Sequence, residues 1–188
     1  MPQGDPSAPA GGAVGHMIRS LQSTTLFRGL DDGEVKFLLR QCGRRRVEAS
    51  EPVFEEQDRG ENLYYILEGE VYLTRRIGEE EEFLALLETG GTFGEAGLFL
   101  EGVRTATVRA KRRTILLVLE KPLLEGLPSD LASKLTRNIA ATSAEKLSLA
   151  NRIIDRLYQQ LRSLQPKEPD WEDAEEDFVK GFEEDPKI

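Results

Sequence analysis

A change in hydrophobic periodicity part-way along the chain is the feature that most constrains its fold. Between Arg44 and Leu119 the apolar residues fall into short runs rich in β-branched and aromatic side chains, and glycine or charge clusters separate these runs. Many short strands at close spacing are typical of a sandwich, a barrel or a jelly roll. The clearest runs are Leu63–Leu67, Val71–Leu73, Phe83–Leu87 and Thr114–Leu119.

The residues before these strands divide into two parts. Residues 1–16 are rich in Pro, Gly and Ala and bury too little apolar surface to offset their ordering entropy, which predicts a disordered leader. From Met17 to Cys42 the apolar spacing predicts two short helices, the second capped by Asp31 or Asp32. Cys42 is the only cysteine in the chain, and we expect it to be an ordinary buried thiol.

A long amphipathic helix is predicted after the strands. It begins at Ser129 or Asp130 and ends before Pro166. A helix longer than about 30 residues cannot pack fully on so small a domain, so part of its apolar stripe should contact a second copy of the chain. Packing within one molecule is the alternative. The predicted fold is therefore α+β: a β jelly-roll barrel with short N-terminal helices and a long C-terminal helix, in a domain spanning residues 17–165.

Most of the negative charge lies at the C-terminal end. The chain has a net charge of -9, and residues 166–188 contain ten acidic residues and three lysines. This acidic tail also contains Trp171, Phe178, Val179 and Phe182, whose spacing allows the aromatic residues to share one helical face. We expect the tail either to dock on another protein or on the barrel, or to be a disordered solubilising segment.

The composition argues against several functional classes. The net charge of -9 argues against a general affinity for nucleic acid, because binding to the phosphate backbone needs clustered Lys and Arg. The residues after Leu164 are too few for a helix-turn-helix domain, and their acidity would repel DNA. No stretch is apolar enough to cross a membrane and no secretory signal is evident, so we expect a cytoplasmic protein. With His16 as the single histidine, we expect no metal site, no catalytic residues, no cofactor and no enzyme activity.

The segment from Gly90 to Val108 has the chemistry expected of a phosphate site. The turn from Gly94 through Ala96 can start a short helix, whose free N–H groups and positive dipole end attract an anion. Arg104 can close the other side with a charge-assisted contact to a phosphate oxygen. Glu95 would repel that phosphate, so its expected role is to accept hydrogen bonds from a neighbouring sugar hydroxyl and to steady Arg104. A simple surface ion pair between Glu95 and Arg104 is the alternative.

This segment resembles the phosphate-binding cassette of the cyclic nucleotide-binding family. Phe93–Glu95, eight further residues and Arg104–Val108 have the spacing of that cassette, and residues 58–71 resemble the second hairpin of the family. The resemblance runs from about residue 27 to residue 150. One departure is Gln57, where the family commonly has glycine before the Asp.

The resemblance implies a role for each residue of the cassette. Arg104, the Thr105 hydroxyl and the Ala106 backbone amide would bind the cyclic phosphate. Gly94 and Glu95 would contact the ribose 2′-hydroxyl. The ligand implied is a cyclic nucleotide, with cAMP as the first choice. A hydroxyl at Thr105 can also serve a guanine amino group in related domains, so cGMP remains open.

Recognition of the base is implied by strand residues and by the long helix. In the family the base lies against apolar strand residues, and Leu73, Leu84 and Leu87 stand in matching positions, although leucines there are equally good core residues. Residues 139–150 are similar, without gaps, to the dimer helix of bacterial catabolite activator proteins. In those proteins a Thr-Ser pair meets the adenine, and the serine comes from the partner subunit.

Thr142 and Ser143 match this Thr-Ser pair. The alternative for both residues is that their hydroxyls lie in the middle of a helix and contact only solvent. The sequence thus predicts a stand-alone regulatory protein that binds cAMP, or cGMP, and that forms a homodimer through its long helix. It would signal to a protein partner by a shift of that helix and of a hinge near Lys121 to Pro128. The competing hypothesis is an interaction module on the same fold that does not sense a nucleotide.

Overall fold

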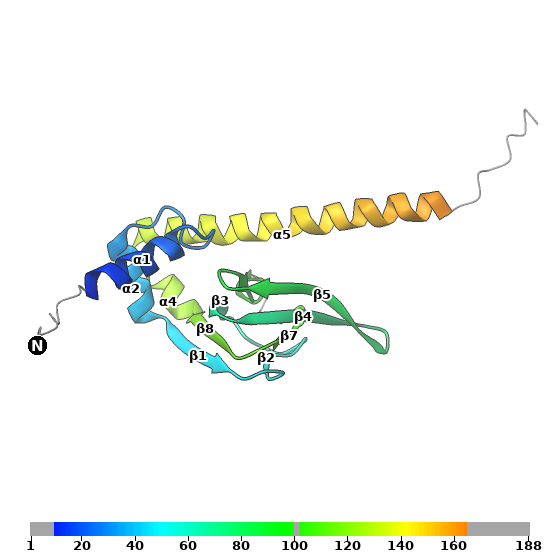
Figure 1. Ribbon diagram of the computed structural model, residues 1–188, viewed down its shortest axis with the longest axis horizontal. Coiled ribbons are helices and arrows are strands. Elements are labelled where there is room, and N and C mark those ends of the chain that lie inside the picture. The colour runs from blue at the N-terminus through cyan, green and yellow to red at the C-terminus, as the bar shows by residue number, and fades with distance from the viewer. Residues whose placement is uncertain (1–9, 100–101, 165–188) are drawn as a thin grey trace, which may run out of the picture. The chain divides into compact units, whose positions relative to one another are not determined.

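The computed structural model describes residues 10–99 and 102–164. The chain divides after Lys146 into two compact units, which are described separately below. The first unit contains all the described strands and the short helices (Figure 1). Within it, two antiparallel sheets of four strands each provide the framework of the candidate site.

The two sheets have the strand orders β1-β8-β3-β6 and β2-β7-β4-β5. The first sheet consists of β1 (Gly43–Val47), β8 (Thr114–Leu119), β3 (Leu63–Glu68) and β6 (Thr92–Phe93). The second consists of β2 (Pro52–Phe54), β7 (Thr107–Ala110), β4 (Glu70–Ile77) and β5 (Glu80–Glu88). Every apolar run singled out in the sequence lies within one of these strands, which confirms the jelly-roll prediction.

The jelly roll is not closed into a continuous barrel, because the described strands form two separate sheets. The edge strands β2 and β6 comprise only three and two residues, too few to continue a hydrogen-bonded ladder from one sheet to the other. The inner faces of the two sheets instead pack on each other. Their shared core includes Ile66, Val71, Phe93, Val108 and Leu116.

The central strands β3 and β8 are buried on both faces. In β3, Tyr64 and Ile66 point into the core between the sheets, while Leu63 and Tyr65 point into a second core formed with the helices. Side chains alternate along a strand, so a strand covered on both faces has a continuous apolar run rather than an alternating one. This explains the continuous apolar runs of β3 and β8.

Two short helices precede the strands, as predicted. α1 (Ala10–Gln22) begins within the stretch expected to be a disordered leader, because its helix continues backwards from the buried anchors Ile18 and Leu21. α2 (Asp32–Gln41) is capped by Asp31. The Asp31 carboxylate accepts from Glu34 N at 2.8 Å, and Glu34 accepts in return from Asp31 N at 2.7 Å.

Cys42 follows α2 directly and is 7% exposed. Burial, with a smaller contribution from Glu120, raises the pKa of its thiol to about 12. The thiol is therefore protonated at neutral pH, as expected of a packing cysteine.

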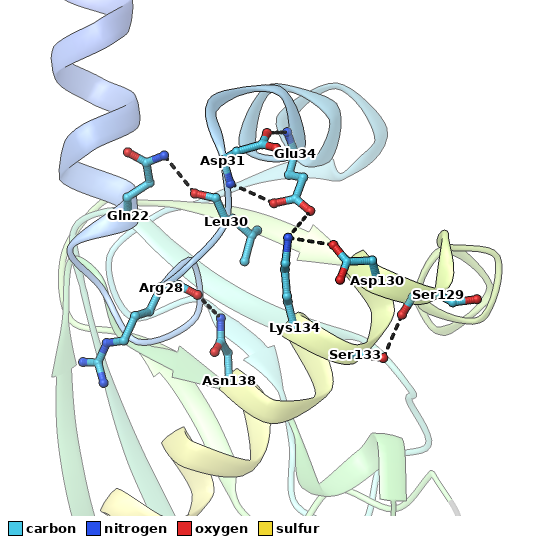
Figure 2. Close-up of polar contacts among 10 residues, drawn as sticks. All are labelled: Gln22, Arg28, Leu30, Asp31, Glu34, Ser129, Asp130, Ser133, Lys134 and Asn138. Carbon is cyan, nitrogen blue, oxygen red and sulfur yellow. Dashed lines mark hydrogen bonds and ion pairs between the residues drawn. The ribbon is translucent and has the colours of Figure 1, made fainter.

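The first turns of α5 (Ser129–Leu164) are fastened to the N-terminal helices by polar contacts (Figure 2). The buried Asn138 donates from Nδ2 to the carbonyl oxygens of Leu26 at 2.9 Å and Arg28 at 2.8 Å. Lys134 bridges Glu34 at 2.8 Å and Asp130 at 2.7 Å. Between β8 and α5 lies the short helix α4 (Lys121–Glu125), in the segment where the sequence suggested a hinge.

The second unit contains the remainder of α5 from Leu147 onwards. Its apolar side chains are exposed to solvent, namely Leu147, Leu149, Ile153, Ile154, Leu157, Tyr158 and Leu161. The residues of the predicted acidic tail lie outside the described part of the chain. None of the described helices is both long enough and apolar enough to cross a lipid bilayer.

Candidate ligand-binding site

A cavity of about 100 Å³ lies in the first unit, beside the short helix α3 (Ala96–Phe99). Strands β2, β4, β6 and β7 contribute to its walls, and α5 contributes Lys146. The structure brings together at this cavity all the residues that the sequence assigned to phosphate and ribose. These are Gly94, Glu95, Ala96, Arg104, Thr105 and Ala106, and Leu73 joins them from the set assigned to the base.

Arg104 is the central charged residue of the cavity and is only 2% exposed. Its Nη1 donates to the carbonyl oxygens of Asn62 at 3.0 Å and Gly94 at 2.9 Å. Its guanidinium carbon lies 4.3 Å from the centroid of the Phe54 ring, a cation–π contact. Burial lowers the pKa of Arg104, while the charges of Tyr64, Asp58 and Glu95 act in the opposite direction.

Two buried polar atoms at this site have no hydrogen-bond partner. They are Nε of Arg104, which is a donor, and Oε2 of Glu95, which is an acceptor. An unpaired buried polar group is costly, so a group of this kind is expected to find a partner. A ligand that offers an anionic oxygen and a nearby hydroxyl would satisfy both atoms at once.

Glycines next to Arg104 are required by the close packing of its guanidinium. Gly94 has a φ of +86°, and a Cβ there would lie 2.8 Å from the Asn62 carbonyl oxygen and 2.9 Å from Nη1 of Arg104. A Cβ on Gly97 would lie 2.7 Å from the same Nη1. Only glycine fits at these two positions without displacing the guanidinium.

Glu95 forms its ion pair with Lys146. The Lys146 ammonium lies 2.6 Å from Oε1 of Glu95 and donates to the Thr92 carbonyl oxygen at 2.8 Å. Arg104, by contrast, is held by backbone carbonyls and an aromatic ring. The alternative in which Glu95 and Arg104 form a simple surface ion pair is therefore wrong.

The chain matches known proteins over the same region. Residues 44–129 match the family model of the cyclic nucleotide-binding domain. The Cyclic AMP receptor protein of Thermus thermophilus is 35% identical over 73% of this chain and 63% of its own length.

Solved structures show the same fold. The crystal structure of the Thermus thermophilus catabolite activator protein matches with a TM-score of 0.65 and 36% identity, over 72% of this chain and 63% of that chain. The N-terminal domain of a transcriptional regulator from Streptomyces coelicolor matches with a TM-score of 0.57 and 31% identity, over 66% of this chain and 92% of that chain.

The chain belongs to the cyclic nucleotide-binding domain family. It spans less than two thirds of the length of the Thermus thermophilus relative, 63%. The residues matched by the family model, 44–129, include every cassette residue that lines the cavity.

Four residues assigned to the base do not line this cavity of the cyclic nucleotide-binding domain. Leu84 is 45% exposed, and Leu87 packs against the core between the sheets. The Thr142 hydroxyl donates to the Asn138 carbonyl oxygen at 3.0 Å, and the Ser143 hydroxyl donates to that of Ile139 at 3.1 Å. Both hydroxyls are thus bonded within α5, and their roles toward a base remain predictions.

Sequence reasoning did not single out Phe54 and Lys146, which also line the cavity. Phe54 gave no signal, because it stands about 50 positions before Arg104 in a strand of three residues. Lys146 could have been found, since it follows Thr142 by four residues and therefore lies on the same face of a helix. Among the residues that the structure describes, no group of three or more His, Cys, Asp or Glu side chains could hold a metal ion.

Proposed function

We propose that this protein is a regulatory protein that binds cAMP in the cavity around Arg104 and signals to a protein partner by a change of conformation. The observation that carries the proposal is the pair of unpartnered buried atoms, Nε of Arg104 and Oε2 of Glu95, at one cavity of a cyclic nucleotide-binding domain. A cyclic nucleotide supplies what each of them lacks. Its phosphate oxygen accepts from the guanidinium, and its ribose 2′-hydroxyl donates to the carboxylate.

The other cassette residues complete this assignment. Thr105 is an exposed residue at the cavity wall, where its hydroxyl can reach a ligand from the solvent side. Ala106 is buried beside it. Because its side chain is a methyl group, its backbone amide is the only donor that it can offer. In this proposal both donate to the phosphate next to the Arg104 contact.

The preference for cAMP is supported by the relative with 35% identity, which is a Cyclic AMP receptor protein. It is also the ligand implied by the Thr142-Ser143 pair in α5. A hydroxyl at Thr105 is compatible with a guanine amino group, so cGMP is the alternative ligand. Comparing both nucleotides in every binding measurement distinguishes the two.

The size of the cavity supports a coupling between binding and conformation. Ligand sites usually enclose roughly 300 to 1,000 Å³, and this cavity measures about 100 Å³. The cavity is thus smaller than a usual ligand site, and one of its wall residues belongs to α5. Ligand binding then shifts the population of α5 conformations, which is the signal to a partner.

Substitution of Arg104 tests the ligand assignment. We expect R104A to weaken cAMP binding in isothermal calorimetry by roughly 100-fold or more, because it removes charge-assisted hydrogen bonds to the phosphate. The control is R109A, which removes a partly exposed arginine that pairs with Glu55 outside this cavity. Circular dichroism should show that both variants keep the fold.

Two outcomes would count against the proposal. Unchanged cAMP affinity in a folded R104A variant would contradict the site. Absence of a thermal shift with either nucleotide in the wild-type protein would favour the interaction module instead, since a ligand at about 100 times its dissociation constant adds roughly 2.7 kcal/mol to the free energy of unfolding.

A further inference from the structure

Lys146 connects α5 to the candidate ligand site at a defined place. Its ammonium contacts Oε1 of Glu95 at 2.6 Å and the Thr92 carbonyl oxygen at 2.8 Å. The Glu95 side chain is 17% exposed and that of Lys146 is 34% exposed, so the pair is partly shielded from water. Lys146 is also the last residue of the first compact unit. The contact thus lies at the C-terminal end of the first unit.

The charges that line the cavity match a cyclic phosphate only when Lys146 is counted. Glu95, Arg104 and Lys146 are the charged lining residues, with a net charge of +1. Without the lysine, Glu95 and Arg104 would cancel. A cyclic phosphodiester carries one negative charge, and a carboxylate beside it would repel it unless a cation neutralises that carboxylate.

The two oxygens of the Glu95 carboxylate have different surroundings. Lys146 occupies Oε1, whereas Oε2 is buried and has no partner. A carboxylate fixed on one oxygen presents the other in a single orientation, which lowers the entropy lost when a ligand hydroxyl binds there. The ribose 2′-hydroxyl can therefore bind Oε2 without breaking the ion pair.

We propose that Lys146 is a positioning residue of the ligand site, which holds Glu95 for the ribose 2′-hydroxyl and neutralises it next to the phosphate. The inference rests on the proposed function. It has a reciprocal consequence, because two events that favour each other must do so equally in both directions. A bound nucleotide strengthens the ion pair that attaches Lys146 of α5 to Glu95. Loss of this ion pair lowers the affinity for the nucleotide.

The test compares three lysine variants by calorimetry with cAMP and with 2′-deoxy-cAMP. We expect K146M to weaken cAMP binding by about tenfold or more, and K146R, which keeps the charge, to restore most of the affinity. The matched control is K134M, since Lys134 also joins α5 to a carboxylate of the first unit but does not line the cavity. K134M should leave the affinity unchanged.

The deoxy ligand separates positioning from general packing. If Lys146 positions Glu95 for the hydroxyl, the penalty of K146M should be smaller by about threefold or more with 2′-deoxy-cAMP, which lacks the hydroxyl that Glu95 receives. The penalty that remains reports repulsion of the phosphate by the carboxylate that is no longer neutralised. K146Q, which keeps a neutral donor toward the Thr92 carbonyl, should show the same pattern. It serves in place of K146M if that variant does not fold.

Each remaining outcome overturns the inference. Equal or tighter binding of cAMP by K146M would mean that Lys146 is neutral or competes with the ligand. An equal penalty with both nucleotides would mean that Lys146 does not hold Glu95 for the 2′-hydroxyl. If the wild-type protein binds neither cAMP nor cGMP, the proposed function fails as well, and that result is distinguishable because it needs no variant.

Discussion

At the scale of single residues, the site depends on the absence of side chains as much as on their presence. Three glycines, Gly60, Gly94 and Gly97, lie so close to Arg104 that a Cβ on any of them would come within 2.9 Å of its guanidinium nitrogens. This packing lets a long charged side chain be buried against Phe54, with its buried Nε left without a partner. The glycines and the arginine therefore form one unit.

Gly97→Ala tests this packing. The new methyl group would lie 2.7 Å from Nη1 of Arg104, so we expect roughly 1 to 3 kcal/mol loss in the free energy of unfolding and a marked loss of cAMP affinity. The control is Gly12→Ala in α1, where a Cβ meets no atom within 4 Å and alanine is the better helix former. Denaturant unfolding and calorimetry measure the two effects, and unchanged binding in Gly97→Ala would contradict the packing argument.

At the scale of elements, the first turns of α5 are held by a buried amide rather than by apolar packing alone. Asn138 is 4% exposed and donates to two carbonyl groups in the turn between α1 and α2, those of Leu26 and Arg28. Figure 2 shows the contact with Arg28. The bond to Leu26 is buried and the bond to Arg28 is partly buried, so water replaces a lost donor poorly. The turn and the helix are therefore bound to each other in register.

Asn138→Ala should weaken this junction. It leaves two carbonyl groups without their donor, so we expect the free energy of unfolding to fall by about 1 to 3 kcal/mol. Ser133→Ala is the control, because the exposed Ser133 hydroxyl bonds only to the Ser129 carbonyl of its own helix. Urea denaturation followed by circular dichroism compares the two, and equal stabilities would contradict the assigned role.

At the scale of the whole molecule, we expect the exposed stripe of α5 to pair with a second copy. Leu147, Ile154 and Leu161 recur every seven residues and are all exposed, and Leu157 follows Ile154 by three. This spacing favours a two-helix contact, because apolar positions of a heptad repeat form one seam. A bare apolar stripe of this length is unfavourable in water.

Ile154→Glu should therefore shift the protein from dimer to monomer in sedimentation velocity. A buried carboxylate at the centre of the seam has no partner and must be desolvated. Gln159→Glu, which makes the same change in charge away from these positions, should leave the dimer intact. A wild-type protein that sediments as a monomer at micromolar concentration would refute the prediction.

Local patterns were sufficient to predict the jelly roll and the cassette. The strands β3, β4, β5 and β8 each contain a run of consecutive apolar residues, and Gly94 and Arg104 lie within one short segment of the sequence. Strand alternation, glycine content and a charged residue at a fixed distance are properties of neighbouring positions. Such local properties can be recognised before the fold is known. This is why the sequence alone assigned six residues that line one cavity.

Tertiary structure decided which distant segments meet. It placed Phe54 under Arg104, gave Glu95 the partner Lys146 from a position 51 residues away, and kept the two sheets open. Periodicity states that a side chain faces inward but not which other face it meets. That choice depends on how the sheets and helices pack across the cavity, and it appears only when the whole chain has folded.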